Sequence, residues 1–269
     1  MESPLSKQQM AFCETIKRSF MEIKGRVAIV TGGTGALGGR LCKTLNREGA
    51  QVVLGYHQSR EAAQKLSTEL SSSGIRSVAV QADVSREEDV ARLVETAMKE
   101  FGRIDILIND AAYNTWVAFP DLQALTLEIW QKILQTNTTG PFLLMRAIGP
   151  IMKKQGQGRI VNIGSIAGFQ PAGSSIAYSV SKAALTHLTR CMAVALAPEV
   201  LVNCVAPGFM EGTRMSSNLS PPYVEKAKKA ALIGKAAEKE DVIEQILTFL
   251  RSESTTGQTV IIDGGRVFH

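Results

Sequence analysis

Short aliphatic runs recur along the chain from residue 25 onward, and each is followed by an amphipathic stretch of helical length. The runs are continuous in Val, Ile and Leu rather than alternating with polar residues, which is typical of strands buried on both faces of a sheet. We predict seven strands, at 27–31, 52–55, 77–81, 104–109, 160–164, 201–205 and 259–262, and long helices at 86–101 and 126–154.

This alternation of strands and helices predicts the fold class, which is α/β. Such a chain forms a Rossmann-type, doubly wound parallel sheet with helices on both faces. No internal repeat and no long Pro/Gly/Ser linker divides residues 25–269, so we expect one domain there. Residues 1–24 form an N-terminal extension, in which 7–23 carries apolar residues partly on one helical face. The pattern leaves open whether this extension docks on the domain or frays.

Composition and charge exclude several classes of function. The 269-residue chain is 45% hydrophobic, which is enough for a large core. Its net charge is +5, and the Lys and Arg residues are scattered along the chain between acidic residues. No basic run is paired with stacking aromatics, so we do not expect nucleic-acid binding. The Cys and His residues lack ligand spacing, which argues against a metal site. No apolar run approaches the roughly 18 residues of a membrane helix, so we expect a cytoplasmic protein that does not enter a membrane.

A glycine-rich turn follows the first predicted strand. In such a strand–turn–helix unit, glycines let backbone N–H groups approach a phosphate, and the helix N-terminus adds partial positive charge. A glycine-rich turn without a ligand would look similar, but its place after the first strand of an α/β chain favours a dinucleotide site. The turn reads Thr31-Gly32-Gly33-Thr34-Gly35-Ala36-Leu37-Gly38, and its cofactor-binding candidates are Gly32, Thr34, Gly35, Leu37 and Gly38.

The end of the second predicted strand bears on the choice of cofactor. NAD-binding proteins place an acidic residue there to bind the adenosine ribose, but this chain has no acid before Glu61. His57, Ser59 and Arg60 are suited to a 2′-phosphate, which a carboxylate would repel. We therefore expect NADP(H), with NAD(H) left open because Arg60 fits equally well as an exposed first-turn residue of a helix.

A tyrosine–lysine pair is the first candidate for chemistry. Tyr178 and Lys182 are four residues apart at the start of a predicted helix that runs to about residue 197, so both lie on one helical face. A phenol with a pKa of about 10 is a poor acid or base at neutral pH, and a neighbouring ammonium lowers that value. The spacing alone is weak evidence, but Ser165 follows the fifth strand, where α/β sheets open onto their ligand crevice.

The order of these and further motifs resembles the short-chain dehydrogenase/reductase family, in its short single-domain branch, over about residues 25–265. The chain is also similar to 3-oxoacyl carrier-protein reductases within it. The motifs fall in family order: the glycine turn at 31–38, Asp83-Val84, Asn109-Asp110-Ala111-Ala112, Asn137, Ser165, Tyr178 with Lys182, Pro207-Gly208, Thr256-Gly257-Gln258 and Asp263-Gly264-Gly265.

The resemblance implies a role for each matching residue. Tyr178 is then the acid/base and Ser165 polarises the carbonyl, while Lys182 holds the nicotinamide ribose and lowers the Tyr178 pKa. Asn137 anchors a water of the proton relay. The implied cofactor contacts are Asp83 and Val84 beside the adenine, Asn109 and Asp110 beside the adenosine ribose, and Pro207, Gly208, Met210 and Thr213 around the nicotinamide.

Three positions depart from the family pattern. Ala36 stands at the middle glycine of the usual turn, so the string as a whole resembles ketoreductase domains of polyketide synthases. Asp110 replaces the second Asn of N-N-A-G, which changes the pocket near the adenosine. Gly35 stands where NADP users commonly have Arg, which is the reason to keep NAD(H) open.

Loops beyond the strand ends are expected to select the substrate. They cover 113–120, 169–175 and 209–234, and we expect the last to act as a lid. Their aromatic and Met residues favour a moderately apolar ketone or secondary alcohol; 3-oxoacyl groups, sugars, steroids and quinones stay open. We therefore expect a carbonyl reductase using NADPH; an NAD-dependent alcohol dehydrogenase and a catalytically silent nucleotide-binding regulator are the alternatives. By analogy to the family, helices 126–154 and 176–197 are expected to pair subunits into a dimer or tetramer.

Overall fold

The computed structural model describes residues 21–217 and 219–268. Seven parallel strands form one sheet in the order β3-β2-β1-β4-β5-β6-β7, which confirms the predicted fold class. The strands are β1 (Val27–Thr31), β2 (Gln51–Tyr56), β3 (Ser77–Gln81), β4 (Ile106–Asn109), β5 (Gly158–Ile163), β6 (Val200–Pro207) and β7 (Thr259–Ile262).

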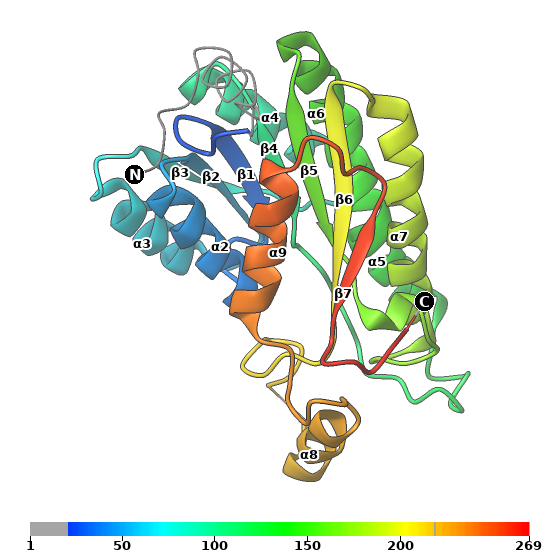
Figure 1. Cartoon of the computed structure of the whole chain (residues 1–269). Coiled ribbons are helices and arrows are strands. Elements are labelled where there is room, and N and C mark those ends of the chain that lie inside the picture. Colours follow the sequence, from blue (N-terminus) through cyan, green and yellow to red (C-terminus); the bar gives the residue numbers. More distant parts are fainter. Residues whose placement is uncertain (1–20, 218, 269) are drawn as a thin grey trace, which may run out of the picture.

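Helices cover both faces of this sheet (Figure 1). The first core cluster joins one face to α2 (Ala36–Arg47), α3 (Arg60–Ser71) and α9 (Lys239–Arg251). The second joins the other face to α4 (Glu87–Phe101), α6 (Gly140–Gln155) and α7 (Ile176–Leu196). The shorter segments are α5 (Leu127–Leu134), the π-helical η1 (Gln135–Thr139), the 3-10 turn η2 (Ile166–Gly168) and α8 (Pro221–Lys229).

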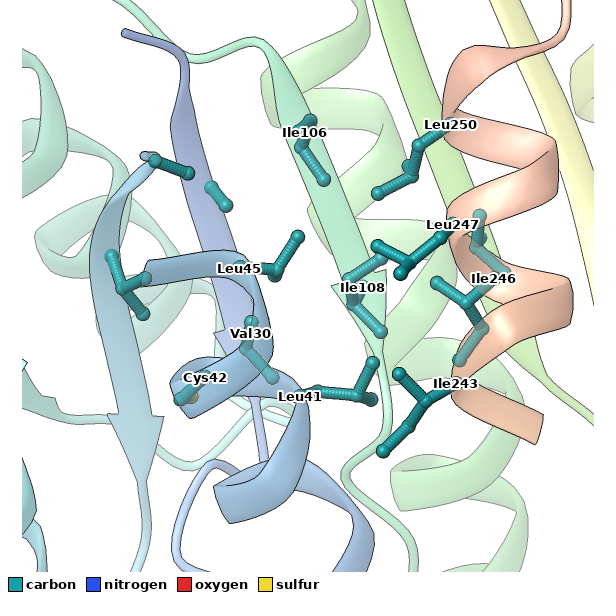
Figure 2. Close-up of a cluster of buried hydrophobic side chains, with 14 of the residues drawn as sticks. Val30, Leu41, Cys42, Leu45, Ile106, Ile108, Ile243, Ile246, Leu247 and Leu250 are labelled. Carbon is teal, nitrogen blue, oxygen red and sulfur yellow. The ribbon is translucent and has the colours of Figure 1, made fainter. Parts of the chain in front are cut away.

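Aliphatic side chains hold the first face together. In Figure 2, Leu41 and Leu45 of α2 and Ile243 and Leu247 of α9 point toward the strand residue Ile108. All five side chains are buried, and burying a side chain of this size stabilises the fold by roughly 1.5–3 kcal/mol. The continuous apolar runs in the sequence therefore reflect strands that are covered on both sides.

The predicted helix at 126–154 is divided in the structure. The π-helical turn Gln135–Thr139 separates α5 from α6, and Asn137 within this turn is buried. At the start of α6, a Cβ on Gly140 would lie 2.7 Å from Cγ2 of Val84, so this helix approaches the end of β3 more closely than a side chain permits. The interruption is therefore built around one buried amide and one close contact.

The N-terminal extension meets the domain through its last residues. Met21 and Ile23 are buried in the first core cluster, in a segment that is not helical. The rest of the helix predicted at 7–23 lies outside the described residues. This short segment anchors the chain where it enters β1.

The sheet positions a ligand crevice at its carboxyl edge. From β1 the chain proceeds outward to β2 and β3, and then returns to place β4 on the other side of β1. A reversal of this kind leaves a crevice beyond the strand ends, in which ligands bind. Figure 1 shows the strands ending at the lower edge, where α8 and its flanking loops extend away from the sheet.

Candidate active site

Ser165 and Tyr178 are brought together at the carboxyl edge of β5. Ser165 lies two residues after the end of β5 and caps η2, where its hydroxyl accepts a hydrogen bond from the Ala167 N–H at 3.1 Å. Ser175 caps α7 by accepting from the Tyr178 N–H at 3.1 Å, which fixes Tyr178 in the first turn of the helix. The predicted serine and tyrosine therefore face one site from two different elements.

The Tyr178 phenol is buried, and burial dominates its ionisation. Burial raises the pKa of Tyr178 to about 12, because the phenolate loses solvation, although a hydrogen bond with the Ser165 hydroxyl acts in the opposite direction. The phenol oxygen also donates toward Sδ of Met215 at 3.7 Å. Tyr178 is therefore a protonated donor at neutral pH.

Lys182 lies one helical turn further along α7 and points toward β5. Its ammonium donates to the backbone carbonyl of Ile163 at 2.7 Å and lies 5.8 Å from the centre of the Tyr178 ring. Burial lowers the pKa of Lys182 to about 8. The pKa of Tyr178 is raised, and not lowered as the helical spacing led us to expect, because burial of the phenol is the largest influence on it.

The Asn137 side chain is fully engaged with protein groups. Its Nδ2 donates to the Tyr113 carbonyl at 2.9 Å and to Oγ of Ser181 at 3.1 Å, and its Oδ1 accepts from the Tyr113 N–H at 2.8 Å. Asn137 thus joins the loop after β4 to helix α7. The resemblance implies that Asn137 anchors a water. This role stays a prediction, and it would fall to the backbone groups of Asn137 because its side chain is engaged.

The glycine-rich turn lies beside the loop that follows β4. Gly32 has a φ of +68°, and a Cβ there would lie 2.9 Å from the backbone nitrogen of Ala111. A Cβ on Gly38 would overlap the Gly32 carbonyl, and Gly35 begins α2 without a side-chain cap. Leu37 packs in the first core cluster, so only its backbone faces the turn. This tight, side-chain-free cradle fits the diphosphate of a dinucleotide.

Asp110 interacts with both this cradle and Lys182. Its partly buried carboxyl accepts from the Gly38 N–H, and burial raises its pKa to about 7, although the charge of Lys182 and this hydrogen bond favour the carboxylate. The neighbouring Asn109 is buried and donates to Oδ1 of Asn162 at 2.7 Å, which ties β4 to β5. Asn109 therefore holds the crevice together, and Asp110 is the residue that faces it.

The residues predicted to contact the adenosine lie just beyond the carboxyl ends of β2 and β3. Nε2 of the exposed His57 lies 3.6 Å from Oδ2 of Asp83, whose Oδ1 also accepts from the Ser85 hydroxyl at 2.6 Å. Val84 is buried, and Arg60 is exposed at the first position of α3. The structure thus places an acid beside His57, which the sequence alone did not indicate.

A cavity opens beside Ser165 and Tyr178, and all three predicted substrate loops contribute to it. Trp116 contacts Tyr223 of α8 edge to face, with ring centres 5.7 Å apart, so the loop after β4 meets the predicted lid. The other described lining residues are Asn114, Ile166, Ala167, Ala172, Gly173, Ser174, Gly208, Phe209, Met210, Thr213, Met215, Ser216, Leu219 and Arg266.

The nicotinamide candidates Gly208, Met210 and Thr213 line this cavity, and Pro207 ends β6 directly before them. Sequence reasoning missed Arg266 and the contact of Met215 with the Tyr178 hydroxyl. Arg266 directly follows the Asp263-Gly264-Gly265 motif, and this position was the signal in the sequence that could have indicated it.

Two structural searches concern other classes of site. Within residues 21–217 and 219–268, no group of three or more His, Cys, Asp or Glu residues is arranged to hold a metal ion. Among the described helices, none is both long and apolar enough to cross a bilayer.

Comparisons with known proteins agree with this geometry. The model of the family described as short chain dehydrogenase matches residues 26–223. The chain is 36% identical to human dehydrogenase/reductase SDR family member 4 (90% of this chain, 88% of that one). It is 35% identical to the 3-oxoacyl-[acyl-carrier-protein] reductase of a Synechocystis strain (91% of this chain, 98% of that one).

A solved structure agrees as well. The NADPH-dependent 3-quinuclidinone reductase of Rhodotorula rubra superposes with a TM-score of 0.84 at 26% identity, over 99% of this chain and 97% of that one. The crevice, the Ser165–Tyr178–Lys182 arrangement and these matches identify the family: the chain belongs to the short-chain dehydrogenase/reductase family of oxidoreductases.

Proposed function

We propose that this chain is an NADP(H)-dependent carbonyl reductase, which converts a ketone into a secondary alcohol. The observation that carries the proposal is the meeting of the Ser165 and Tyr178 hydroxyls at the wall of one cavity. Bound NADPH supplies the hydride for the carbonyl carbon. The glycine turn is suited to its diphosphate, since Gly35 begins α2 without a side-chain cap and leaves the N–H groups of the helix N-terminus uncovered.

The protein's own part in the reaction is to orient the carbonyl and to deliver a proton. The Ser165 hydroxyl donates a hydrogen bond to the carbonyl oxygen, and the Tyr178 phenol gives its proton to the same oxygen as negative charge develops there. A phenol with a pKa of about 12 is protonated at neutral pH. Ketone reduction uses this protonated form as the proton donor, whereas alcohol oxidation needs a proton acceptor.

Lys182 and Asn137 support this step from α7 and η1. The ammonium of Lys182 is buried one turn from Tyr178, where it is suited to the hydroxyls of the nicotinamide ribose. Asn137 holds the Tyr113 loop against α7, so that the cavity wall and the proton donor keep their relative positions.

The preference for NADP(H) over NAD(H) rests on the adenosine end. No acid ends β2, and Arg60 lies exposed beside it with no ion-pair partner among the described residues. The carboxylate of Asp83, whose Oδ2 lies 3.6 Å from Nε2 of His57, argues against NADP(H) because it would repel a 2′-phosphate. We give more weight to Arg60, because a 2′-phosphate is a strong acceptor for a guanidinium and Asp83 is already engaged by Ser85.

Assembly and location complete the proposal. Phe142 of α6, and Val180 and Val194 of α7, expose apolar side chains, and Val194 is 83% exposed. Exposed apolar positions on these two helices support their pairing in a homodimer or homotetramer. A cytoplasmic location stays a prediction.

The test is a screen of ketones and secondary alcohols with NADPH, NADH and their oxidised forms, repeated with Tyr178→Phe. We expect NADPH-dependent ketone reduction, with kcat lowered about 10²- to 10⁴-fold in the variant because only the proton donor is lost. NADPH affinity, followed by its fluorescence, should change little. The matched control Tyr56→Phe removes a phenol oxygen from a buried side chain of β2.

Two outcomes would contradict the proposal. Full kcat in Tyr178→Phe would exclude this phenol as the proton donor. NADPH binding by the unaltered protein without turnover of any ketone or alcohol would favour the silent nucleotide-binding regulator.

A further inference from the structure

The substrate cavity contains a single charged side chain among its described lining residues, and this side chain is a cation. Arg266 reaches the cavity from the C-terminal tail, and no Asp, Glu, Lys or His is present among the other lining residues. Apolar side chains contribute much of the remaining wall, including Phe209, Met215 and Leu219 from the segment 209–234 and Trp116 from the loop after β4. The cavity thus combines an apolar body with one positive group.

The backbone that carries Arg266 is held in place. The buried carboxylate of Asp263 accepts from the N–H groups of Gly265 at 2.9 Å, Arg266 at 3.1 Å and Val267 at 2.7 Å. Figure 1 shows the tail running from the lower end of β7 to the lower end of α7, along the carboxyl edge of the sheet. Arg266 is therefore presented from a fixed turn.

The guanidinium of Arg266 has no ion-pair or hydrogen-bond partner among residues 21–217 and 219–268. Two other shielded arginines do have partners: the partly buried Arg26 pairs with Asp105 at 3.2 Å, and the buried Arg159 pairs with Glu253 at 2.9 Å. A guanidinium in a partly buried, mainly apolar setting is most stable with an anionic acceptor, and its planar fork matches a carboxylate or a phosphate.

We propose that Arg266 is a specificity-determining residue that binds an anionic group on the carbonyl substrate, while the ketone lies at Ser165 and Tyr178. The substrate class is then an oxo acid, or the phosphate ester of an oxo alcohol, whose apolar skeleton lies along Trp116 and Met215. This inference rests on the proposed carbonyl-reductase function, and it narrows that function from ketones in general to anionic ketones.

The kinetic test compares matched substrates. A medium-chain oxo carboxylate, its methyl ester and a phosphate ester of the same skeleton are assayed with the unaltered protein, Arg266→Gln and Arg266→Lys. We expect the unaltered protein to favour an anionic substrate over the ester by about tenfold or more in kcat/KM, as for a hydrogen bond to a charged group. In Arg266→Gln this preference should be lost, because the KM for the anionic substrate rises while kcat changes little. Arg266→Lys should keep part of the preference. The preferred anion identifies carboxylate or phosphate as the group.

A control variant tests whether the effect belongs to Arg266 or to any lost positive charge. Arg47→Gln removes an exposed positive charge from α2, away from the cavity, and should leave the preference unchanged. Equal losses on acid and ester in Arg266→Gln, or an unchanged preference, would overturn the proposal.

Direct binding separates this inference from the proposed function. A saturated medium-chain carboxylate and its methyl ester, neither of which can be reduced, are titrated against the full chain by calorimetry. Binding of the carboxylate that is lost in Arg266→Gln would support the anion site even if no ketone is turned over. Equal binding of acid and ester would overturn the anion site, whatever the outcome of the ketone screen.

Discussion

The crevice at the ends of β1 and β4 and the cavity at the ends of β5 and β6 adjoin each other, yet they are built from different parts of the chain. Glycines and backbone groups shape the crevice, where side chains at Gly32 and Gly38 would collide with the main chain. Side chains from three loops and the tail shape the cavity, including Trp116, Met215 and Arg266.

This difference teaches where the molecule is free to vary. A crevice made of backbone accepts one kind of ligand, because its shape depends on the absence of side chains. A cavity made of loop side chains can be altered one residue at a time without disturbing the sheet. Substitutions that add or remove atoms in the two regions therefore test the comparison.

The largest effect is expected for Gly38→Ala in the crevice. The added methyl group would overlap the Gly32 carbonyl and lie 2.8 Å from Oδ2 of Asp110, so the turn must shift. We expect NADPH affinity to fall by about 100-fold or more and the free energy of unfolding by about 1–3 kcal/mol. Fluorescence titration and urea unfolding measure the two quantities.

The neighbouring glycine supplies a matched control. A Cβ on Gly39 would meet the Gly33 carbonyl at 3.5 Å, which is ordinary contact. Gly39→Ala should bind NADPH normally and gain stability, since Ala is the better helix former. Equal effects of the two substitutions would mean that the crevice does not depend on the close approach at Gly38.

A smaller, pH-dependent effect is expected for Asp110→Asn. The pKa of Asp110 is raised to about 7 by burial, so ionising this carboxyl costs free energy in the folded protein that it does not cost in the unfolded chain. The folded state of the unaltered protein therefore loses stability as the pH rises from about 4 to about 7. Asn cannot ionise but still accepts from the Gly38 N–H. The stability of the variant relative to the unaltered protein should thus increase by about 1–3 kcal/mol between pH 5 and pH 8.

Urea unfolding at the two pH values measures this change. Glu95→Gln, which removes an exposed carboxylate from α4, should show almost none of it. A difference between Asp110→Asn and the unaltered protein that is the same at both pH values would show that Asp110 is ionised alike in the folded and unfolded states.

The smallest effect is expected at the solvent-exposed end of the crevice, where side chains again take part. Arg60→Gln removes the guanidinium from the start of α3. The KM for NADPH should rise about three- to tenfold, because an exposed charge-assisted contact is screened by water and salt, while the KM for NADH should stay the same. Steady-state kinetics with both cofactors measure this, and a preference of the unaltered protein for NADH would refute the NADP(H) assignment.

The comparison also separates what could be predicted from the sequence from what could not. The strand runs and the turn at 31–38 were predictable, because continuous Val, Ile and Leu runs and closely spaced glycines are local patterns. The placement of Ser165 followed from its position after a strand, and that of Tyr178 and Lys182 on one helical face from their i, i+4 spacing. All of these depend on residues that are close in sequence.

The missed features depend on packing between distant segments. Arg266 reaches the cavity because the Asp263 turn directs the tail toward it. The raised pKa values of Tyr178 and Asp110 depend on burial by several elements, which for Asp110 outweighs the charge of Lys182. The break at 135–139 depends on the buried amide of Asn137 meeting a loop 24 positions earlier.

Asn137 also has a mechanical consequence. Two of its side-chain hydrogen bonds join it to the backbone of Tyr113, and a third joins it to the hydroxyl of Ser181, one position before Lys182 on α7. The loop from Tyr113 to Trp116, which lines the cavity through Asn114 and Trp116, and the helix that carries Tyr178 are thereby joined to each other. The described part of residues 209–234 supplies a further part of the cavity wall and is not held by these three bonds.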